Sequence, residues 1–372
     1  MALDAWLRTA YAAPSGGRRW LDLLAKHGDV IHILNLPRAE LEAAGLSRAC
    51  VDKLLAPDTA ILDAWRDWLS PPGRAFVALD SPAYPALLRD SPDPPVALWV
   101  AGGDLGLLNA PQIAIVGSRN PTRSGRDTAE RFASYLSERG LTITSGLATG
   151  IDGAGHLGAL AGGGGTIAVL GSGLDIIFPP SHTGLAERIA ANGLLVSEFP
   201  PGTPPRAAHF PQRNRIIAGL SIGTLVVEAA RRSGSLITAR LAGEYGREVF
   251  AIPGSIHNPL AKGCHELIRQ GAKLVDDAAD ILVELAPLLA IELERTAPVD
   301  SAEIAPLSLT EQPAYKALLE ALGFDPIGFS MLVERTGLTA AELSSMLLVL
   351  EFEGLVESLP GSRYARLAER TS

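Results

Sequence analysis

Short turns of glycine, serine and basic residues recur in the middle of the chain, and each follows an apolar run. These turns are Gly117-Ser118-Arg119, Ser145-Gly146, Gly171-Ser172-Gly173 and Ser233-Gly234. Glycine lets a backbone approach an anion closely, and the free N–H groups that begin a helix bind phosphate. Tight packing explains one such turn equally well. Several in one chain favour a row of phosphate contacts, which suits a polyanionic strand better than a single nucleotide.

A second cluster places an aromatic ring beside basic side chains. Phe210 is followed by Arg213, Asn214 and Arg215, and Arg206 precedes it by four positions. Aromatic stacking combined with arginine contacts is how proteins hold single strands without reading their sequence. Taken alone, Phe210 is better interpreted as a core residue. Together with the glycine turns, it favours a single-strand interface.

The charge is distributed unevenly along the chain. The net charge of -9 divides into -3 over residues 1–110, +5 over residues 111–275 and -11 over residues 276–372. Between Arg206 and Arg240 there are six arginines and one acidic residue. Because Lys and Arg that neutralise phosphates supply most of the affinity for nucleic acid, the middle block is the predicted binding surface.

The loops that bind nucleotides in common enzymes are missing from this sequence. It has no G-x-x-x-x-G-K-S/T loop, and its first predicted core strand is not followed by G-x-G-x-x-G. Asp152, Glu198 and Glu228 are the acids nearest the predicted ligand edge, and we interpret them as supports for the glycine loops and arginines. The Cys264-His265 pair falls short of the about four ligands of a zinc site. We predict no enzymatic activity, no cofactor and no metal.

Cysteine usage and the first residues indicate the compartment. Cys50 and Cys264 are the only cysteines, which fits a reducing environment. Asp4 and Arg8 interrupt the place where a signal peptide needs an apolar run, and no segment approaches the ~20 apolar residues of a membrane span. We predict a cytoplasmic protein without a membrane span.

The elements that would position the turns are parallel strands. From Gln112 onward, short apolar runs alternate with helical patterns, as in βαβ units. Their lack of period-2 alternation indicates strands covered on both faces. The predicted strands are 113–116, 141–144, 166–170, 194–197, 224–227, 248–252 and 273–275. The glycine turns then lie at the carboxyl ends of the strands, where open α/β sheets bind ligands.

The flanking segments differ from this core. Residues 1–70 read as short helices, a small domain of the sterile-alpha-motif or helix-hairpin-helix kind, and residues 71–110 read as a connector packed on the core. Residues 291–308 form a predicted linker, and residues 309–372 have the helix and strand order of a winged helix. The predicted fold class is α/β: an extended Rossmann-like parallel sheet over residues 111–290 between a helical domain and a winged-helix-like domain.

The middle domain resembles the DNA-processing protein A (DprA/Smf) family. The matching strings occur in order through that domain: Gly117-Ser118-Arg119, Ser145-Gly146-Leu147-Ala148, Gly150-Ile151-Asp152, residues 210–221, residues 233–239 and Val249-Phe250-Ala251-Ile252-Pro253-Gly254. The resemblance implies an extended Rossmann fold that binds single-stranded DNA and forms a homodimer. It also implies a protein that protects incoming DNA and helps to load RecA recombinase during natural transformation, without catalytic activity.

The resemblance also assigns roles to residues. Arg119 would bind backbone phosphate, Phe210 would stack on a base, and the glycine and serine loops would give main-chain or hydroxyl contacts. Many members carry a lysine three residues before the phenylalanine; here Ala207 occupies that position, and Arg206 is a candidate substitute. Leu267 and Ile268 are candidate dimer contacts. The complete predicted DNA-binding set is Gly117, Ser118, Arg119, Ser145, Gly146, Gly171, Arg206, Phe210, Arg213, Asn214, Arg215, Ser233 and Gly234.

Two alternative functions remain. One is a nucleotide-processing phosphoribohydrolase on a related Rossmann-like fold, with Glu228 as its catalytic acid. Such enzymes typically carry Pro-Gly-Gly-x-Gly-Thr ahead of the glutamate, whereas Pro253-Gly254 here is followed by Ser255-Ile256. The other is transcriptional regulation through the winged helix, which the charge of -11 over residues 276–372 disfavours.

Overall fold

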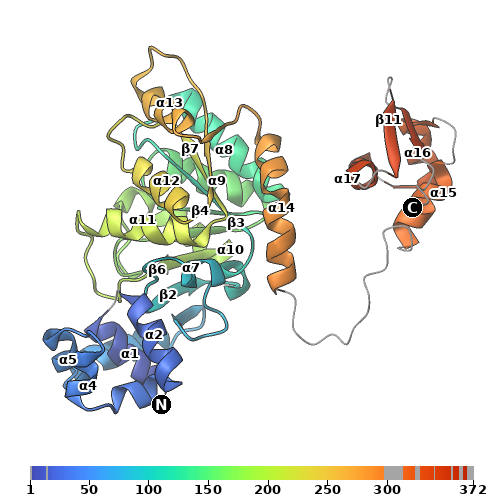
Figure 1. Cartoon of the computed structure of the whole chain (residues 1–372). Coiled ribbons are helices and arrows are strands. Elements are labelled where there is room, and N and C mark those ends of the chain that lie inside the picture. The colour runs from blue at the N-terminus through green and yellow to red at the C-terminus, as the bar shows by residue number, and fades with distance from the viewer. Residues whose placement is uncertain are drawn as a thin grey trace. The chain divides into compact units, whose positions relative to one another are not determined.

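The computed structural model describes residues 2–13, 16–296, 313–322, 327–338, 340–352, 355–359 and 363–366. The chain divides into two units, residues 1–296 and residues 297–372, which are described separately (Figure 1). Within the described ranges, no helix is long and apolar enough to cross a membrane.

A nine-stranded sheet forms the centre of the first unit, in the order β1-β2-β6-β5-β4-β3-β7-β8-β9. In this order, the strands β6, β5, β4, β3, β7, β8 and β9 are parallel to one another. At the other edge, β2 pairs antiparallel with β6, and β1 pairs antiparallel with β2. Their bounds are β1 Arg74–Ala78, β2 Ala97–Gly102, β3 Gln112–Gly117, β4 Thr142–Ser145, β5 Thr166–Val169, β6 Leu194–Ser197, β7 Gly223–Val227, β8 Glu248–Ala251 and β9 Lys273–Leu274. The seven predicted core strands are confirmed.

The segment predicted as a connector is instead part of the sheet. It supplies both β1 and β2. The ring of Phe76 on β1 packs edge-on against Trp99 on β2, with 4.9 Å between ring centroids. This cross-strand aromatic contact stabilises a strand whose sequence gives only a weak local signal.

Strand order creates a switch point at β3. The chain runs outward from β3 through β4, β5 and β6, then returns to β7 on the other side of β3 and continues through β8 to β9. Connections that leave adjacent strands in opposite directions open a crevice at the carboxyl ends of those strands. The ends of β3 and β7 are therefore the place where this fold can hold a ligand.

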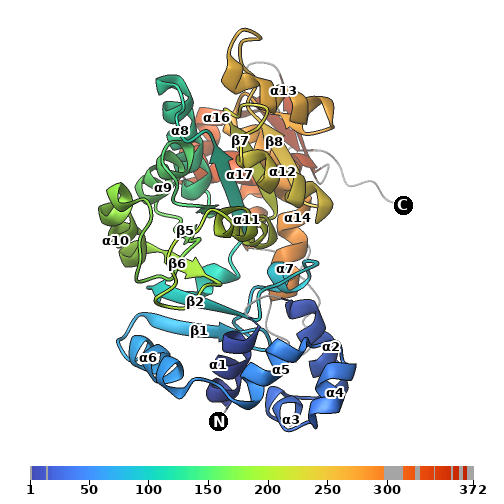
Figure 2. The same ribbon diagram turned by 90° about the vertical axis from the view of Figure 1, so that its left-hand side faces the viewer.

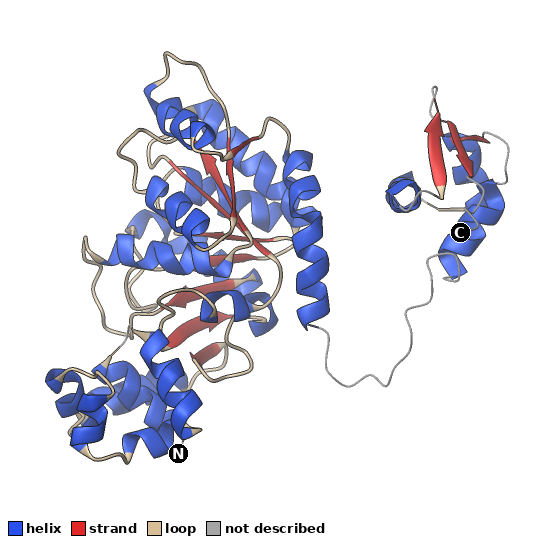
Figure 3. Ribbon diagram, in the orientation of Figure 1, coloured by secondary structure: helices blue, strands red, loops and turns tan. Residues whose placement is uncertain are grey.

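Helices cover both faces of the sheet (Figures 2 and 3). Ile113 and Ile115 of β3 pack with α8 (Arg123–Glu138), α9 (Ile151–Gly162) and α14 (Ala278–Thr296). Ala114 and Val116, which alternate with them, belong to the core that holds α11 (His209–Leu220), α12 (Ser235–Glu244) and α13 (Lys262–Arg269). The remaining helices of this region are α7 Ala86–Arg89, α10 Thr183–Asn192, and the short 3-10 helices Leu105–Leu108, Pro180–His182 and Pro259–Ala261.

Six helices precede the sheet: α1 Ala2–Ala12, α2 Gly17–His27, α3 Val30–Leu34, α4 Arg38–Ala43, α5 Arg48–Leu55 and α6 Thr59–Leu69. The side chains of Asp29, Ser47 and Asp58 accept backbone N–H bonds at the starts of α3, α5 and α6. The ring of Trp65 on α6 meets Trp99 on β2, with 5.3 Å between centroids. The helices thus share a core with the sheet edge and belong to the same unit.

The second unit confirms the predicted winged-helix order. Its elements are α15 Pro313–Leu322, β10 Ile327–Gly328, α16 Phe329–Thr336, α17 Ala340–Phe352, β11 Val356–Leu359 and β12 Arg363–Arg366. Its strands form a sheet in the order β10-β12-β11, and its helices pack through Leu318, Leu332 and Leu347. Of the predicted linker, residues 291–296 belong to α14, and residues 297–308 lie outside the described residues.

Candidate nucleic-acid interface

A groove of 780 Å³ opens at the carboxyl ends of β3 and β7, where the strand order predicts a ligand site. Its walls come from the loops after these strands, the start of α11 and the start of α12. Eight of the thirteen predicted DNA-binding residues line it: Gly117, Ser118, Arg119, Phe210, Arg213, Asn214, Ser233 and Gly234. Residues far apart in sequence therefore meet in one concave surface.

Arg119 and Phe210 form the centre of the groove. The Arg119 side chain is exposed, and its guanidinium carbon lies 5.7 Å from the centroid of the half-buried Phe210 ring. The guanidinium of Arg213 lies 6.0 Å from the same centroid. An aromatic face beside an exposed cation can hold a base by stacking while the cation binds the adjoining phosphate.

Phe178 is a groove residue that the sequence did not single out. The residue is 42% exposed and lines the groove, and its ring lies 5.6 Å from the Phe210 ring, centroid to centroid. The loop that carries it is held by Asp175, whose carboxylate accepts the Gly202 N–H at 2.9 Å. The available signal was its position, seven residues after Gly171 in a segment without a helix or strand pattern.

The loop that carries Arg119 is fixed by its backbone. Ser118 donates its N–H to the Glu228 carbonyl at 2.7 Å, and its own carbonyl accepts the Ile151 N–H at 3.1 Å. Gly150 has a φ of 84°, and a Cβ there would lie 2.3 Å from the Ser118 carbonyl oxygen. Only glycine allows this close approach without displacing the loop.

Glu228 serves this loop with its side chain as well. One carboxylate oxygen accepts the Thr122 N–H and the other accepts the Thr122 hydroxyl, each at 2.7 Å. Thr122 in turn caps α8 by accepting the Gly125 N–H at 3.0 Å. Both oxygens of Glu228 are engaged, and the residue does not line the groove. This geometry favours a supporting role over that of a catalytic acid.

Arg213 lies under the groove rather than above it. It is 4% exposed, and its Nη1 donates to the Gly146 carbonyl at 2.6 Å and to the Val169 carbonyl. Burial lowers the pKa of Arg213 to about 10 and raises the pKa of Asp152, while the charge of each opposes the effect on the other. Asp152 accepts the N–H groups of Gly146 and Ala148 at 3.2 and 3.3 Å. These groups form a buried, hydrogen-bonded floor.

Ser145 and Gly146 belong to that floor. Ser145 is fully buried and donates its hydroxyl to the Ile115 carbonyl at 2.6 Å. A Cβ at Gly146 would lie 2.6 Å from the Arg213 guanidinium nitrogens. Neither residue lines the groove: the Ser145 hydroxyl bonds β3, and the Gly146 carbonyl holds Arg213 beneath the groove.

Arg215 points into the protein. Its Nη2 donates to the buried carboxylate of Glu198 at 2.5 Å, and its Nε lies 3.6 Å from Asp93. Burial raises the pKa of Glu198 to about 7, and the Arg215 charge opposes this effect. Arg215 does not line the groove, and we therefore leave it out of the interface. The ion pair instead ties α11 to the end of β6.

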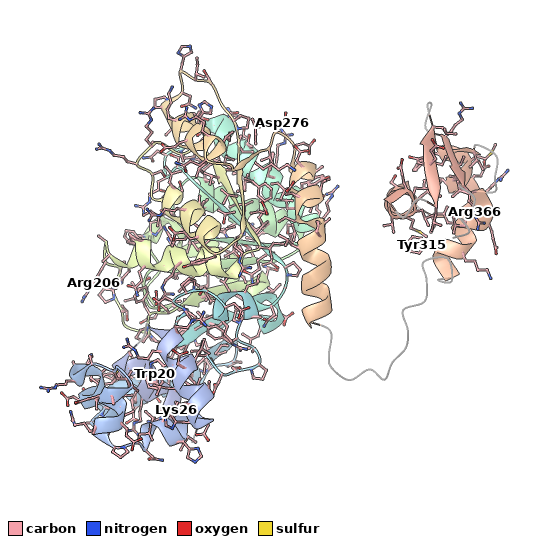
Figure 4. All side chains as sticks on the ribbon, viewed as in Figure 1. Trp20, Lys26, Arg206, Asp276, Tyr315 and Arg366 are labelled. Atoms are coloured by element: carbon pink, nitrogen blue, oxygen red, sulfur yellow. The ribbon has the colours of Figure 1, made fainter. Side chains whose placement is uncertain are left out.

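Gly171 and Arg206 lie beside the groove. A Cβ at Gly171 would come within 3.1 Å of the Phe210 ring, so this glycine leaves room for the ring. Arg206 is exposed and projects from the loop before α11 (Figure 4). Ala207 lines the groove at the position of the expected lysine. To replace that lysine, the Arg206 side chain would have to extend past Ala207 into the groove.

The loop after β7 forms another part of the groove wall. The hydroxyls of Ser233 and Ser235 lie 2.7 Å apart, and Asn214 donates its side-chain amide to the Gly234 carbonyl at 3.3 Å. Gly234 is exposed, with open space where a Cβ would be. Its backbone is accessible to a ligand in the groove.

The candidate dimer residues differ in exposure. Leu267 is 9% exposed and packs in the core of its own chain, and Ile268 is partly buried. Ile256 and Leu274 in the same region are 67% and 46% exposed. Among the described residues there is no group of three or more His, Cys, Asp and Glu side chains that could hold a metal ion.

The α/β fold with a groove at the carboxyl edge of its sheet agrees with the protein families that the sequence matches. The family model described as DNA recombination-mediator protein A matches residues 75–286. The model of the DprA winged helix domain matches residues 302–362. The chain belongs to the DNA recombination-mediator protein A (DprA/Smf) family.

Curated relatives and solved structures agree with this assignment. Protein Smf of Escherichia coli is 42% identical over 328 residues, which cover 88% of this chain and 86% of the relative. The X-ray structure of DNA processing protein A from Streptococcus pneumoniae has a TM-score of 0.67 and 39% identity, covering 75% of this chain and 95% of the other. The Helicobacter pylori protein, described for its single-stranded DNA binding mode, has a TM-score of 0.51 and 31% identity, with coverages of 57% and 96%.

Proposed function

We propose that this protein is a non-catalytic recombination mediator that binds single-stranded DNA in the groove at the ends of β3 and β7. The observation that carries the proposal is the meeting of exposed Arg119 with the Phe210 and Phe178 rings in that groove. The solved Helicobacter pylori relative, described for its single-stranded DNA binding mode, supports it.

The groove would hold the strand through two kinds of contact. Arg119 binds a phosphate, and the accessible backbone of Gly234 adds a main-chain contact to the same polyanion. Phe210 and Phe178 offer ring faces to successive bases, each stack contributing about 1–3 kcal/mol. Stacking tolerates any base, so binding shows little sequence preference.

An enzymatic role has less support at this site. The Glu228 carboxylate is occupied by Thr122, and Asp152 is buried and bonded to backbone N–H groups. The Glu228 carboxylate does not line the groove, and the Asp152 carboxylate, which does, is engaged by the N–H groups of Gly146 and Ala148. A phosphoribohydrolase is therefore the weaker alternative.

The family to which the chain belongs supports a proposal about its cellular role. We propose that it acts in the cytoplasm as a homodimer, protects incoming single strands and helps RecA to assemble on them during natural transformation. The two free, buried cysteines, Cys50 and Cys264, fit a reducing compartment.

The test is a titration with three ligands: an oligo-dT strand, a duplex of the same length and a mononucleotide. We expect tight binding of the single strand, weaker binding of the duplex and none of the mononucleotide. Binding of the mononucleotide alone would favour the enzyme. For the RecA step, the wild-type protein should accelerate RecA assembly on single strands, and an Arg119→Glu variant should not.

A further inference from the structure

A second hollow adjoins the groove. It has a volume of 580 Å³ and is lined by Arg231, Arg232, Glu266, Arg269 and Gln270. Arg232 also lines the groove, so the two concave surfaces meet at this side chain. None of the predicted DNA-binding residues lines the hollow.

The hollow gathers more positive than negative charge. Its three arginines are exposed, and within the described part of the chain no ion pair or hydrogen bond joins their guanidinium groups to a protein acceptor. Glu266 is the single acid among the five lining residues. Like charges held around one depression raise its positive potential, and an anion that enters it lowers the electrostatic free energy.

The backbone fixes the two segments that carry these arginines. Arg231 and Arg232 follow β7, and Arg269 ends α13. Gly263 at the start of α13 donates its N–H to the Ala229 carbonyl at 2.7 Å, and a Cβ at Gly263 would lie 2.5 Å from that oxygen. This close approach holds α13 against the segment after β7.

We propose that a strand bound in the groove continues past Arg232 into this hollow, where Arg231 and Arg269 bind its phosphates. The inference rests on the proposed function and extends the footprint of the site. Continuity through Arg232 favours one strand over a separate partner. None of the five lining side chains is apolar or aromatic. Guanidinium groups match phosphate geometry in two-pronged hydrogen bonds.

The experiment compares two strand lengths with an Arg231→Gln/Arg269→Gln double variant. A strand of about 6 nucleotides fits one groove, and one of about 20 reaches beyond it. The matched control is Arg139→Gln/Arg188→Gln, which removes the same charge from two exposed positions, the residue that follows α8 and a position on α10, that line neither surface. Affinities for oligo-dT of both lengths are measured at several salt concentrations.

We expect the double variant to bind the short strand like the wild-type protein and the long strand at least five-fold more weakly. The slope of log affinity against log salt for the long strand should fall by about 1.4, since each lost phosphate contact removes about 0.7. The inference would be overturned if the double variant bound the long strand with wild-type affinity, or if the control variant lost as much affinity as the double variant. An acidic protein segment would then be the better candidate for the ligand of the hollow. If the wild-type protein binds neither strand, the proposed function itself fails.

Discussion

Arg119, Arg213 and Arg215 are three arginines with three different environments. Arg119 is exposed in the groove, Arg213 is buried beneath it, and Arg215 is paired with Glu198 inside the protein. A guanidinium that already satisfies backbone carbonyls or a carboxylate has few donors left for phosphate. Of these three residues, we therefore propose Arg119 as the one that binds DNA.

Reversing the charge at Arg119 tests this difference. Arg119→Glu should abolish most single-strand binding and leave the melting temperature within a degree or two, because the side chain is exposed and makes no core contact. Arg139→Glu, at the opposite end of α8, is the control and should bind normally. Oligo-dT titration and thermal melting of both variants are sufficient. Unaltered affinity of Arg119→Glu at low salt would refute the role of Arg119.

The two phenylalanines make a separate prediction. Phe210→Ala and Phe178→Ala should each weaken oligo-dT binding by about 1–3 kcal/mol, or about 5-fold to 150-fold, with a similar loss for oligo-dA. Phe178→Tyr keeps the ring and should bind like the wild-type protein. If Phe210→Ala instead lowers the melting temperature sharply without a specific loss of affinity, that ring belongs to the core.

Most of the residues that meet in the groove could be predicted from the sequence. The role of each residue there could not. Six arginines between Arg206 and Arg240 read as one basic stretch, because residue type does not reveal burial. Their roles are separated by α11, which turns Arg213 and Arg215 inward and presents Phe210 to the groove. Phe178 escaped notice because only the folded loop brings it beside Phe210.

At the scale of the elements, local patterns were sufficient for the parallel strands and failed at the sheet edge. The core strands are buried apolar runs that stand out locally, whereas β1 is five residues whose stability depends on Trp99 and the neighbouring strand. The helix α3, of five residues, is likewise too short to show a helical period. Tertiary packing decides such elements.

Packing of α9 on β5 makes the stability depend on pH. His156 is fully buried, its Nδ1 lies 2.8 Å from the Thr166 hydroxyl, and burial lowers its pKa from 6.5 to about 3. Below pH 6.5, His156 is protonated in the unfolded chain and stays neutral in the folded chain. Stability is therefore full above pH 6.5 and falls as the pH drops toward 3, by at most about 1.4 kcal/mol per pH unit.

The measurement is urea unfolding of the wild-type protein and His156→Asn between pH 4 and 7. As the pH falls from 7 to 4, the free energy of unfolding of the wild-type protein should decline more steeply than that of the variant. Comparing the two slopes cancels other groups, including Glu198, whose raised pKa acts in the opposite direction between pH 4.5 and 7. Parallel slopes would mean that His156 takes up a proton in the folded state at ordinary pH.

At the scale of the whole molecule, the chain combines a basic middle with acidic flanks. The region from residue 276 onward has 6 Lys and Arg against 17 Asp and Glu, while residues 111–275 have 16 against 11. A winged helix that binds DNA sets basic side chains against phosphates. We therefore propose that the first unit binds DNA and that the second serves protein contacts or regulation.

Removing residues 300–372 tests that assignment. The truncated protein should bind oligo-dT with nearly the affinity of the full chain and should keep the same oligomeric mass by light scattering. The two units are separate in their internal contacts, so the first should fold without the second. A ten-fold loss of affinity, about 1.4 kcal/mol, would make the winged helix a DNA-binding element.

The most direct test of the account is to locate the bound strand. An oligo-dT that carries 5-iodouracil at single positions is bound to the full chain and irradiated, because this base crosslinks to aromatic rings that stack on it. Mass spectrometry then identifies the attached peptides. We predict crosslinks on Phe210 and Phe178, and their loss in Arg119→Glu under the same conditions. Crosslinks confined to the N-terminal helices or the winged helix would contradict a single-strand site in the groove.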